Sequence, residues 1–151
     1  MKKQRIIFGI GSNLGDRELF LNLALSKLEK ELFLSNIKKS QIFKNPAMLM
    51  PNSPQEWDRE FFNIAVSADI DLEKFTPEKI IEIVKKIEKD LGRVEREKWA
   101  PREIDIDILA IETLRIHIDH KLTIPHPGLL ERDFFIKTVG EIEPQILKKL
   151  Q

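Results

Sequence analysis

One segment alternates apolar and polar residues without interruption, and this regularity constrains the fold more than any other feature. Apolar residues stand at every even position from 62 to 72, whereas the odd positions hold mostly polar residues. Successive side chains of a β-strand point to opposite faces, so the pattern predicts a strand with one apolar face. Strands of this alternating kind are typical of antiparallel sheets.

Helical patterns separate the remaining strand-like segments. Leucines recur at helical spacing after Asp16, and isoleucines do so after Thr76. Aspartate and threonine often cap the N-terminus of a helix. The order β-α-β-β-α-β favours an α+β fold with a mostly antiparallel, ferredoxin-like sheet and helices packed on it, rather than a Rossmann fold. We expect helices after Asp16, after Thr76 and from about Arg132, and strands at 5–10, 37–44, 62–72, 104–109 and 115–118.

Composition argues against several classes of function. The chain of 151 residues has equal numbers of basic and acidic side chains and no cysteine. A formal net charge of zero gives no support to nucleic-acid binding, and a chain without cysteine has no disulfides or thiolate metal sites. Its apolar runs are too short to span a membrane. We expect one cytoplasmic domain that covers residues 1–151 and has neither a membrane nor a nucleic-acid partner.

Two aspartates share one face of the segment APREIDIDIL. Asp105 and Asp107 alternate with isoleucines, so the two residues lie about 7 Å apart on one face of the predicted strand. One or two hydrated cations can bridge that distance, and Mg²⁺ prefers oxygen ligands of this kind. The spacing alone allows a solvated strand face equally well. The basic residues between 93 and 102 favour a site for metal-bound phosphates, because these need positive groups around them.

Three other motifs are ambiguous when each is considered alone. The run from Gly9 to Gly15 has one residue too many for a dinucleotide fingerprint and favours a tight strand-to-helix turn. His126 lies between two prolines, where a turn or capping residue is more common than a catalyst. Asn63 is equally consistent with an ordinary solvated strand residue and with a side chain that reads a polar heterocycle.

The chain contains GSNLGDR, FFNIAV, LGRVEREKWAPREIDIDIL and TIPHPGLLERDFF, in that order, between Ile6 and about Pro144. Together these segments resemble the 6-hydroxymethyl-7,8-dihydropterin pyrophosphokinase family of folate biosynthesis. The resemblance implies a ferredoxin-like fold, with ATP and two Mg²⁺ as cofactors and a pterin alcohol as the second substrate. The implied reaction moves a pyrophosphoryl group from ATP to the pterin hydroxymethyl group and releases AMP.

The resemblance also implies roles for individual residues. Asp105 and Asp107 match two aspartates that bind both magnesium ions. Arg93 and Arg102 match catalytic arginines on a mobile loop that engage the nucleotide or the transferred group. Trp99 matches a tryptophan of that loop that closes on the nucleotide side. Residues that match the ATP site are Glu88, Arg96, Ile108, Lys121, Thr123, His126 and Arg132. Residues that match the pterin site are Asn45, Met48, Phe61, Asn63 and Phe134.

Some positions depart from the family pattern, and two rival functions stay open. Ala100 replaces a usual glycine, Glu95 stands where many members have arginine, and Pro127 occupies a position that can be aromatic. The rivals are a glycosyltransferase with a D-x-D pair and a non-catalytic ferredoxin-like binding module. The sequence leaves open the oligomeric state, and whether the domain is fused to or associated with dihydropteroate synthase in a bifunctional enzyme.

Overall fold

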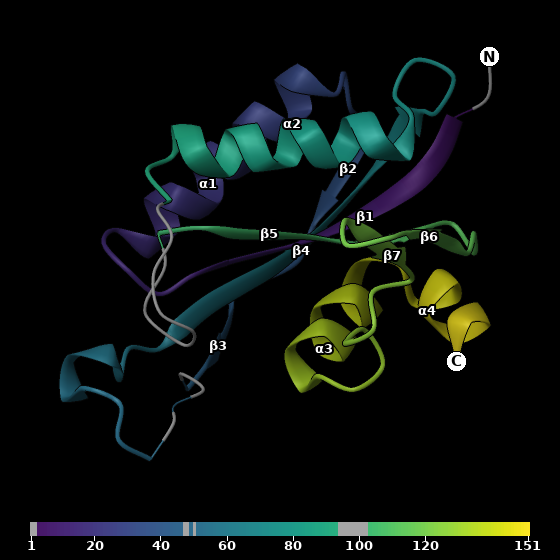
Figure 1. The fold of residues 1–151 in the computed structure, drawn as a ribbon. Coiled ribbons are helices and arrows are strands. Elements are labelled where there is room, and N and C mark those ends of the chain that lie inside the picture. Colours follow the sequence, from purple (N-terminus) through teal and green to yellow (C-terminus); the bar gives the residue numbers. More distant parts are fainter. Residues whose placement is uncertain (1–2, 47–48, 50, 94–102) are drawn as a thin grey trace.

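The computed structural model describes residues 3–46, 49, 51–93 and 103–151 (Figure 1). The strands are β1 (Lys3–Ser12), β2 (Ser35–Lys39), β3 (Phe43–Asn45), β4 (Phe61–Asp71), β5 (Asp105–Ile111), β6 (Ile116–Ile118) and β7 (Leu122–Ile124). The helices are α1 (Arg17–Glu31), α2 (Pro77–Asp90), α3 (Asp133–Ile142) and α4 (Pro144–Leu150), with a short 3₁₀ helix at Gln55–Trp57.

The main sheet is antiparallel and has the strand order β2-β4-β1-β5, and β3 pairs with another part of β4. The long strands β1 and β4 form its centre (Figure 1). α1 connects β1 to β2, and α2 connects β4 to β5. This order and these connections are those of a ferredoxin-like fold, which confirms the predicted class. β6 and β7 form a separate antiparallel hairpin.

Helices cover both faces of the sheet (Figure 1). α1 and α2 pack on one face, where they contact even-numbered residues of β1 such as Ile6 and Phe8. α3 and α4 pack on the opposite face, against Ile7 and Ala65. We call this second face the α3 face. The odd-numbered side of β4 is therefore covered over much of its length, and Ala65 and Ser67 are fully buried.

The first two helices begin where local signals predict. The side chain of Asp16 accepts a hydrogen bond from the Leu19 amide (3.1 Å) at the start of α1, and Thr76 caps α2 in the same way. Gly92 follows α2 with a φ of +95°, a conformation that glycine adopts at little cost. In the described part of the chain, no helix combines the length and apolar composition of a membrane span.

Two strand predictions need correction. The expected strand 37–44 is divided into β2 and β3, because Ser40 turns into the structure and its hydroxyl accepts a hydrogen bond from Ala65 N (2.9 Å). The strand β7 is missing from the predictions. It has three residues, and so short a segment shows no alternation that sequence reasoning could detect.

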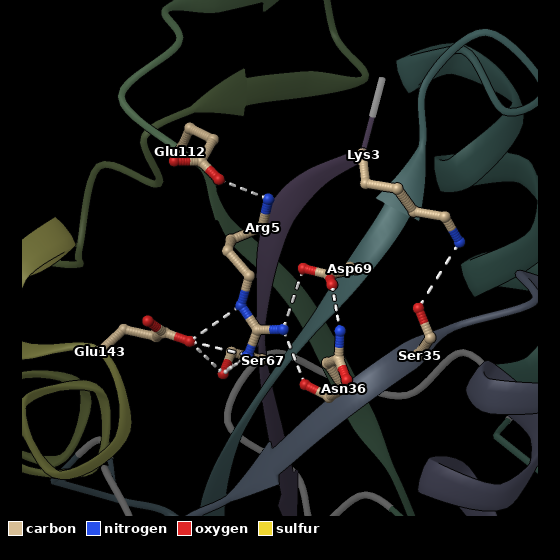
Figure 2. Close-up of polar contacts among 8 residues, drawn as sticks. All are labelled: Lys3, Arg5, Ser35, Asn36, Ser67, Asp69, Glu112 and Glu143. Atoms are coloured by element: carbon tan, nitrogen blue, oxygen red, sulfur yellow. Dashed lines mark hydrogen bonds and ion pairs between the residues drawn. The ribbon is translucent and has the colours of Figure 1, made fainter. Parts of the chain in front are cut away.

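A network around Arg5 fastens the C-terminal helices to the sheet at one end of the α3 face (Figure 2). The Arg5 guanidinium donates to Glu143 Oε2 through Nε (3.0 Å) and Nη2 (2.8 Å), and to Asp69 Oδ1 through Nη1 (3.1 Å). The hydroxyl of Ser67 also donates to Glu143 Oε2 (2.7 Å). Glu143 separates α3 from α4, so this network helps to hold α3 in place.

Candidate active site

Three neighbouring strands bring the predicted metal and pterin residues onto the α3 face. In the register of β1, Gly11 pairs with Asn63 on β4 and with Asp105 on β5. Directly paired residues of adjacent strands point to the same face. Adjacent strands are about 4.8 Å apart, so roughly 10 Å separates the backbones of Asn63 and Asp105. Gly11 lies between them, and because glycine has no side chain, none projects from β1 at this position.

Asp105 is tied to a buried glutamate through Arg93. Nη1 of Arg93 donates to Asp105 Oδ1 (3.0 Å) and to Glu88 Oε2 (2.6 Å). The same Glu88 oxygen accepts a hydrogen bond from the amide of Ile106 (2.8 Å), which lies between the two aspartates. Burial raises the pKa of Glu88, although the Ile106 amide and the Arg93 charge oppose the rise. Glu88 therefore fixes both β5 and the arginine.

Asp107 lies in an environment that disfavours its negative charge. Burial and the charge of Asp105 raise the pKa of Asp107 to about 7, and the charge of Arg132 only partly offsets them. A cation bound between the carboxylates would relieve this repulsion. Within the described residues, no group of three or more His, Asp or Glu side chains could hold a metal. Two carboxylates alone fit Mg²⁺, which commonly completes its shell with water and phosphate oxygens.

His126 presents a nitrogen to this carboxylate pair. Its Nδ1 accepts a hydrogen bond from the Gly128 amide (2.9 Å), so the ring proton of the neutral form belongs on Nε2. Nε2 lies 3.7 Å from Asp107 Oδ1, too far for a direct hydrogen bond. Burial and the nearby charge of Arg132 lower the pKa of His126. The ring is therefore a neutral donor aimed at the site.

A cavity of about 320 Å³ opens beside Asp107 and His126. Its wall comes from α2, β5 and the β6–β7 hairpin. Of the residues predicted for the ATP site, the structure brings Ile108, Lys121, Thr123 and His126 together here. Glu88 is not among the residues that line the cavity; it lies behind β5, bonded to Ile106 and Arg93.

The cavity also contains polar residues that sequence reasoning missed, namely Lys85, His117 and His120. Lys85 lies one turn before Glu88 on α2, and that spacing was a signal that could have pointed to it. His117 was hidden because its position depends on β7. In the hairpin it pairs with Thr123, and His117 Nδ1 lies 3.0 Å from Thr123 Oγ1.

Three of the residues predicted for the pterin site, Asn45, Phe61 and Asn63, lie on β3 and β4, on the other side of Gly11 from Asp105. Asn63 is only 8% exposed, which corrects the reading of it as a solvated strand residue. Its Nδ2 donates to Asn45 Oδ1, so the two carboxamides are joined across β3 and β4. Phe61 is half-buried two residues before Asn63, on the same side of β4.

Two predicted residues lie at the start of α3. Phe134 packs edge-on against Phe135, with ring centroids 4.5 Å apart, and the guanidinium of Arg132 lies 5.6 Å from the centre of the Phe135 ring. α3 contacts both β3 and β4, the strands that carry Asn45 and Asn63. Four predicted site residues lie outside the described part of the chain and stay predictions: Met48, Arg96, Trp99 and Arg102.

Comparison with known proteins assigns the chain to a family. Residues 7–144 match the family model of 7,8-dihydro-6-hydroxymethylpterin-pyrophosphokinase (HPPK). The chain belongs to the HPPK family. The 2-amino-4-hydroxy-6-hydroxymethyldihydropteridine pyrophosphokinase of Aquifex aeolicus is 39% identical over 144 residues, which are 94% of this chain and 82% of that protein. The protein of the same name from Methylorubrum extorquens is 34% identical and covers 95% of this chain.

Some HPPK relatives are much longer than this chain. The folate synthesis bifunctional protein of Chlamydia trachomatis is 38% identical over 92% of this chain, which spans only 30% of that protein's length. The crystal structure of Plasmodium falciparum HPPK-DHPS aligns with a TM-score of 0.63 over 92% of this chain and 41% of that one. The sequence identity there is 12%, so this likeness concerns the fold alone.

Proposed function

We propose that the HPPK chain carries out the family's reaction on the α3 face of its sheet, with Asn63 reading the pterin and Asp105 and Asp107 at the reacting phosphates. In that reaction the hydroxymethyl oxygen of 6-hydroxymethyl-7,8-dihydropterin attacks the β-phosphorus of ATP. The bond from the β-phosphorus to the oxygen shared with the α-phosphorus breaks, AMP leaves, and the hydroxyl proton passes to solvent. The main support for the proposal is that Gly11 pairs with both Asn63 and Asp105, so a residue predicted for the pterin site and one predicted for the metal lie two strands apart on one face.

The cavity beside Asp107 suits the nucleotide. Ile81, Ile108 and Leu122 give it apolar walls for a purine ring. Lys85 and Lys121 supply positive charge for the phosphates. With these residues around the nucleotide, the polyphosphate chain extends toward Asp107 and His126, and the Nε2 proton of His126 is placed to donate to a phosphate oxygen.

The carboxylate pair suits magnesium, and we propose two ions, as in the family. Bound Mg²⁺ would neutralise phosphate charge and help to align the reacting groups. Two contacts position the carboxylate pair. Glu88 accepts a hydrogen bond from the Ile106 amide on β5, and Arg93 donates one to Asp105. Transfer through a loose transition state demands little of a general base, so positioning and charge are the main tasks of the protein.

The pterin site offers amide groups and aromatic rings. The joined carboxamides of Asn45 and Asn63 match a heterocycle with alternating hydrogen-bond donors and acceptors. Phe61 and Phe134 supply rings for stacking on it. Met48, Arg96, Trp99 and Arg102 are proposed to complete the two sites. We also propose that residues 1–151 act as one pyrophosphokinase domain, alone or joined to a dihydropteroate synthase.

Binding measurements test this assignment. The bond that breaks lies between the α- and β-phosphates, so α,β-methylene-ATP is an inert analogue of ATP. Calorimetry should show that the analogue binds the chain only weakly without Mg²⁺. It should also show that the pterin binds to the complex of the chain, Mg²⁺ and the analogue. A non-catalytic module would show no Mg²⁺-dependent binding of the analogue. A glycosyltransferase would bind the nucleotide but not the pterin, and either result contradicts the proposal.

A further inference from the structure

The strand β1, one of the two central strands of the sheet, carries Gly11 between two of the predicted site residues. Gly11 lies between Asn63 and Asp105, its partners on the two neighbouring strands. Gly15 and Gly92 have positive φ angles, whereas Gly11 does not. Its backbone conformation is therefore open to any residue, although glycine in the interior of a strand weakens the strand. Conformational freedom does not explain why this position has no side chain.

Space does explain it. A Cβ atom added at Gly11 would lie 2.7 Å from Asn63 Oδ1 and 3.6 Å from Phe61 Cδ1. The carboxamide of Asn63 therefore lies over the backbone of β1, at the place a side chain would fill. At its other end, Nδ2 of Asn63 donates to Asn45 on β3. The carboxamide thus lies between β3 and β1. Its oxygen lies over β1, the strand that pairs with β5 at Asp105.

We propose that Gly11 is a positioning residue for the pterin: by lacking a side chain, it lets the Asn63 carboxamide lie across β1. This inference rests on the proposed function, since Asn63 is taken to read the pterin. Asn63 contacts the substrate, and Gly11 acts only through Asn63. A methyl group at position 11 would push the carboxamide away from β1 and spoil its hydrogen bonds to the pterin.

Replacing Gly11 by alanine tests the proposal. Gly11→Ala should weaken pterin binding in the presence of Mg²⁺ and α,β-methylene-ATP by about tenfold or more, as expected when a buried hydrogen bond is lost. Binding of the nucleotide analogue with Mg²⁺ should stay within about twofold of wild type, since the cavity is built from other elements. The control is Gly140→Ala on α3, where the nearest atom to an added Cβ is Leu147 Cδ2 at 3.6 Å. It should change neither affinity.

A second pair of variants separates an effect through Asn63 from a general effect on the fold. Asn63→Ala removes the atoms that the new methyl group would meet. In that background, Gly11→Ala should cost less than about twofold in pterin affinity, because the two changes remove the same interaction. If Gly11→Ala alone fails to fold, adding Asn63→Ala should restore the thermal transition. A further large loss in the double variant, or no recovery of folding, overturns the proposal.

The same variants distinguish failure of this inference from failure of the proposed function. Unchanged pterin affinity in Asn63→Ala would show that Asn63 does not bind the pterin. That result would contradict both the pterin site of the proposed function and the positioning role of Gly11. A clear loss in Asn63→Ala, together with wild-type affinity in Gly11→Ala, would leave the proposed function intact and contradict only the role of Gly11.

Discussion

Arg93 Nη1 lies 3.0 Å from Asp105 Oδ1, so a guanidinium group contacts one of the two proposed metal ligands. The same nitrogen lies 2.6 Å from Glu88 Oε2, which keeps it in that position. A cation that binds Asp105 must share the negative charge of this carboxylate with Arg93 or displace the Arg93 side chain. If Asp105 binds the metal as proposed, Arg93 and the metal compete for this carboxylate in the protein without nucleotide.

This competition predicts the behaviour of Arg93→Ala. Without nucleotide, the variant should bind Mn²⁺, a paramagnetic substitute for Mg²⁺, about two- to tenfold more tightly than wild type, because a positive charge next to the ligand is gone. Electron paramagnetic resonance of free Mn²⁺ measures this. Arg93→Lys keeps the charge and should lie closer to wild type. Weaker or unchanged Mn²⁺ binding in Arg93→Ala would show that the arginine does not compete.

The raised pKa of Asp107 predicts how stability depends on pH. The pKa is about 7 in the folded chain against an ordinary value of 3.8, so the folded state keeps a proton that the unfolded state has released. In the metal-free protein, this group makes stability fall as pH rises from about 4 to 7. At pH 8, Asp107→Asn should raise the free energy of unfolding by about 1–3 kcal/mol.

Urea unfolding in EDTA at pH 5 and pH 8 checks this. The wild type should lose more stability between the two pH values than Asp107→Asn does. An equal loss in both proteins would mean that Asp107 is not the group responsible. Added Mg²⁺ with α,β-methylene-ATP should reduce the difference, because a ligand that binds only the folded state stabilises it.

The Arg5 network predicts a stability effect far from the site (Figure 2). The side chains of Arg5 and Glu143 are 17% and 12% exposed. Glu143→Ala should lower the free energy of unfolding by about 2–4 kcal/mol, because Arg5 is left without its main partner in a largely buried place. Lys3→Ala is the matched control: its exposed 3.5 Å contact with Ser35 should contribute less than about 0.5 kcal/mol. Similar losses in both variants would contradict the buried role.

The fold was predictable where the signals are local. The alternation at 62–72 and the caps Asp16 and Thr76 each depend on a few neighbouring residues, and all three appear in the structure. The second layer of helices was harder to foresee. Ser67 and Asn63 are both buried. They lie on the face of the sheet that α3 and α4 cover, and these helices come much later in the chain, so the alternation alone still allowed a solvated face.

The positions of the candidate site residues were predictable where the residues lie close in sequence, and less so where tertiary contacts bring them together. Asp105 and Asp107 share a face because of strand geometry alone, and β5 has that geometry. His117 reaches the cavity only because a short hairpin folds over it, and Gly11 matters only because β4 lies beside β1. The register between strands, which sequence periodicity does not specify, is what brings the predicted metal and pterin residues together.

The product analysis of a single reaction tests the central claim most directly. ATP labelled in the β-phosphate is mixed with Mg²⁺, 6-hydroxymethyl-7,8-dihydropterin and the chain, and the products are separated. We predict that AMP and a labelled pterin diphosphate form in equal amounts, and that Asp105→Ala and Asp107→Ala each lower the rate by about a hundredfold or more while remaining folded. Formation of ADP, label that stays out of the pterin, or near-normal rates in both variants would contradict the account.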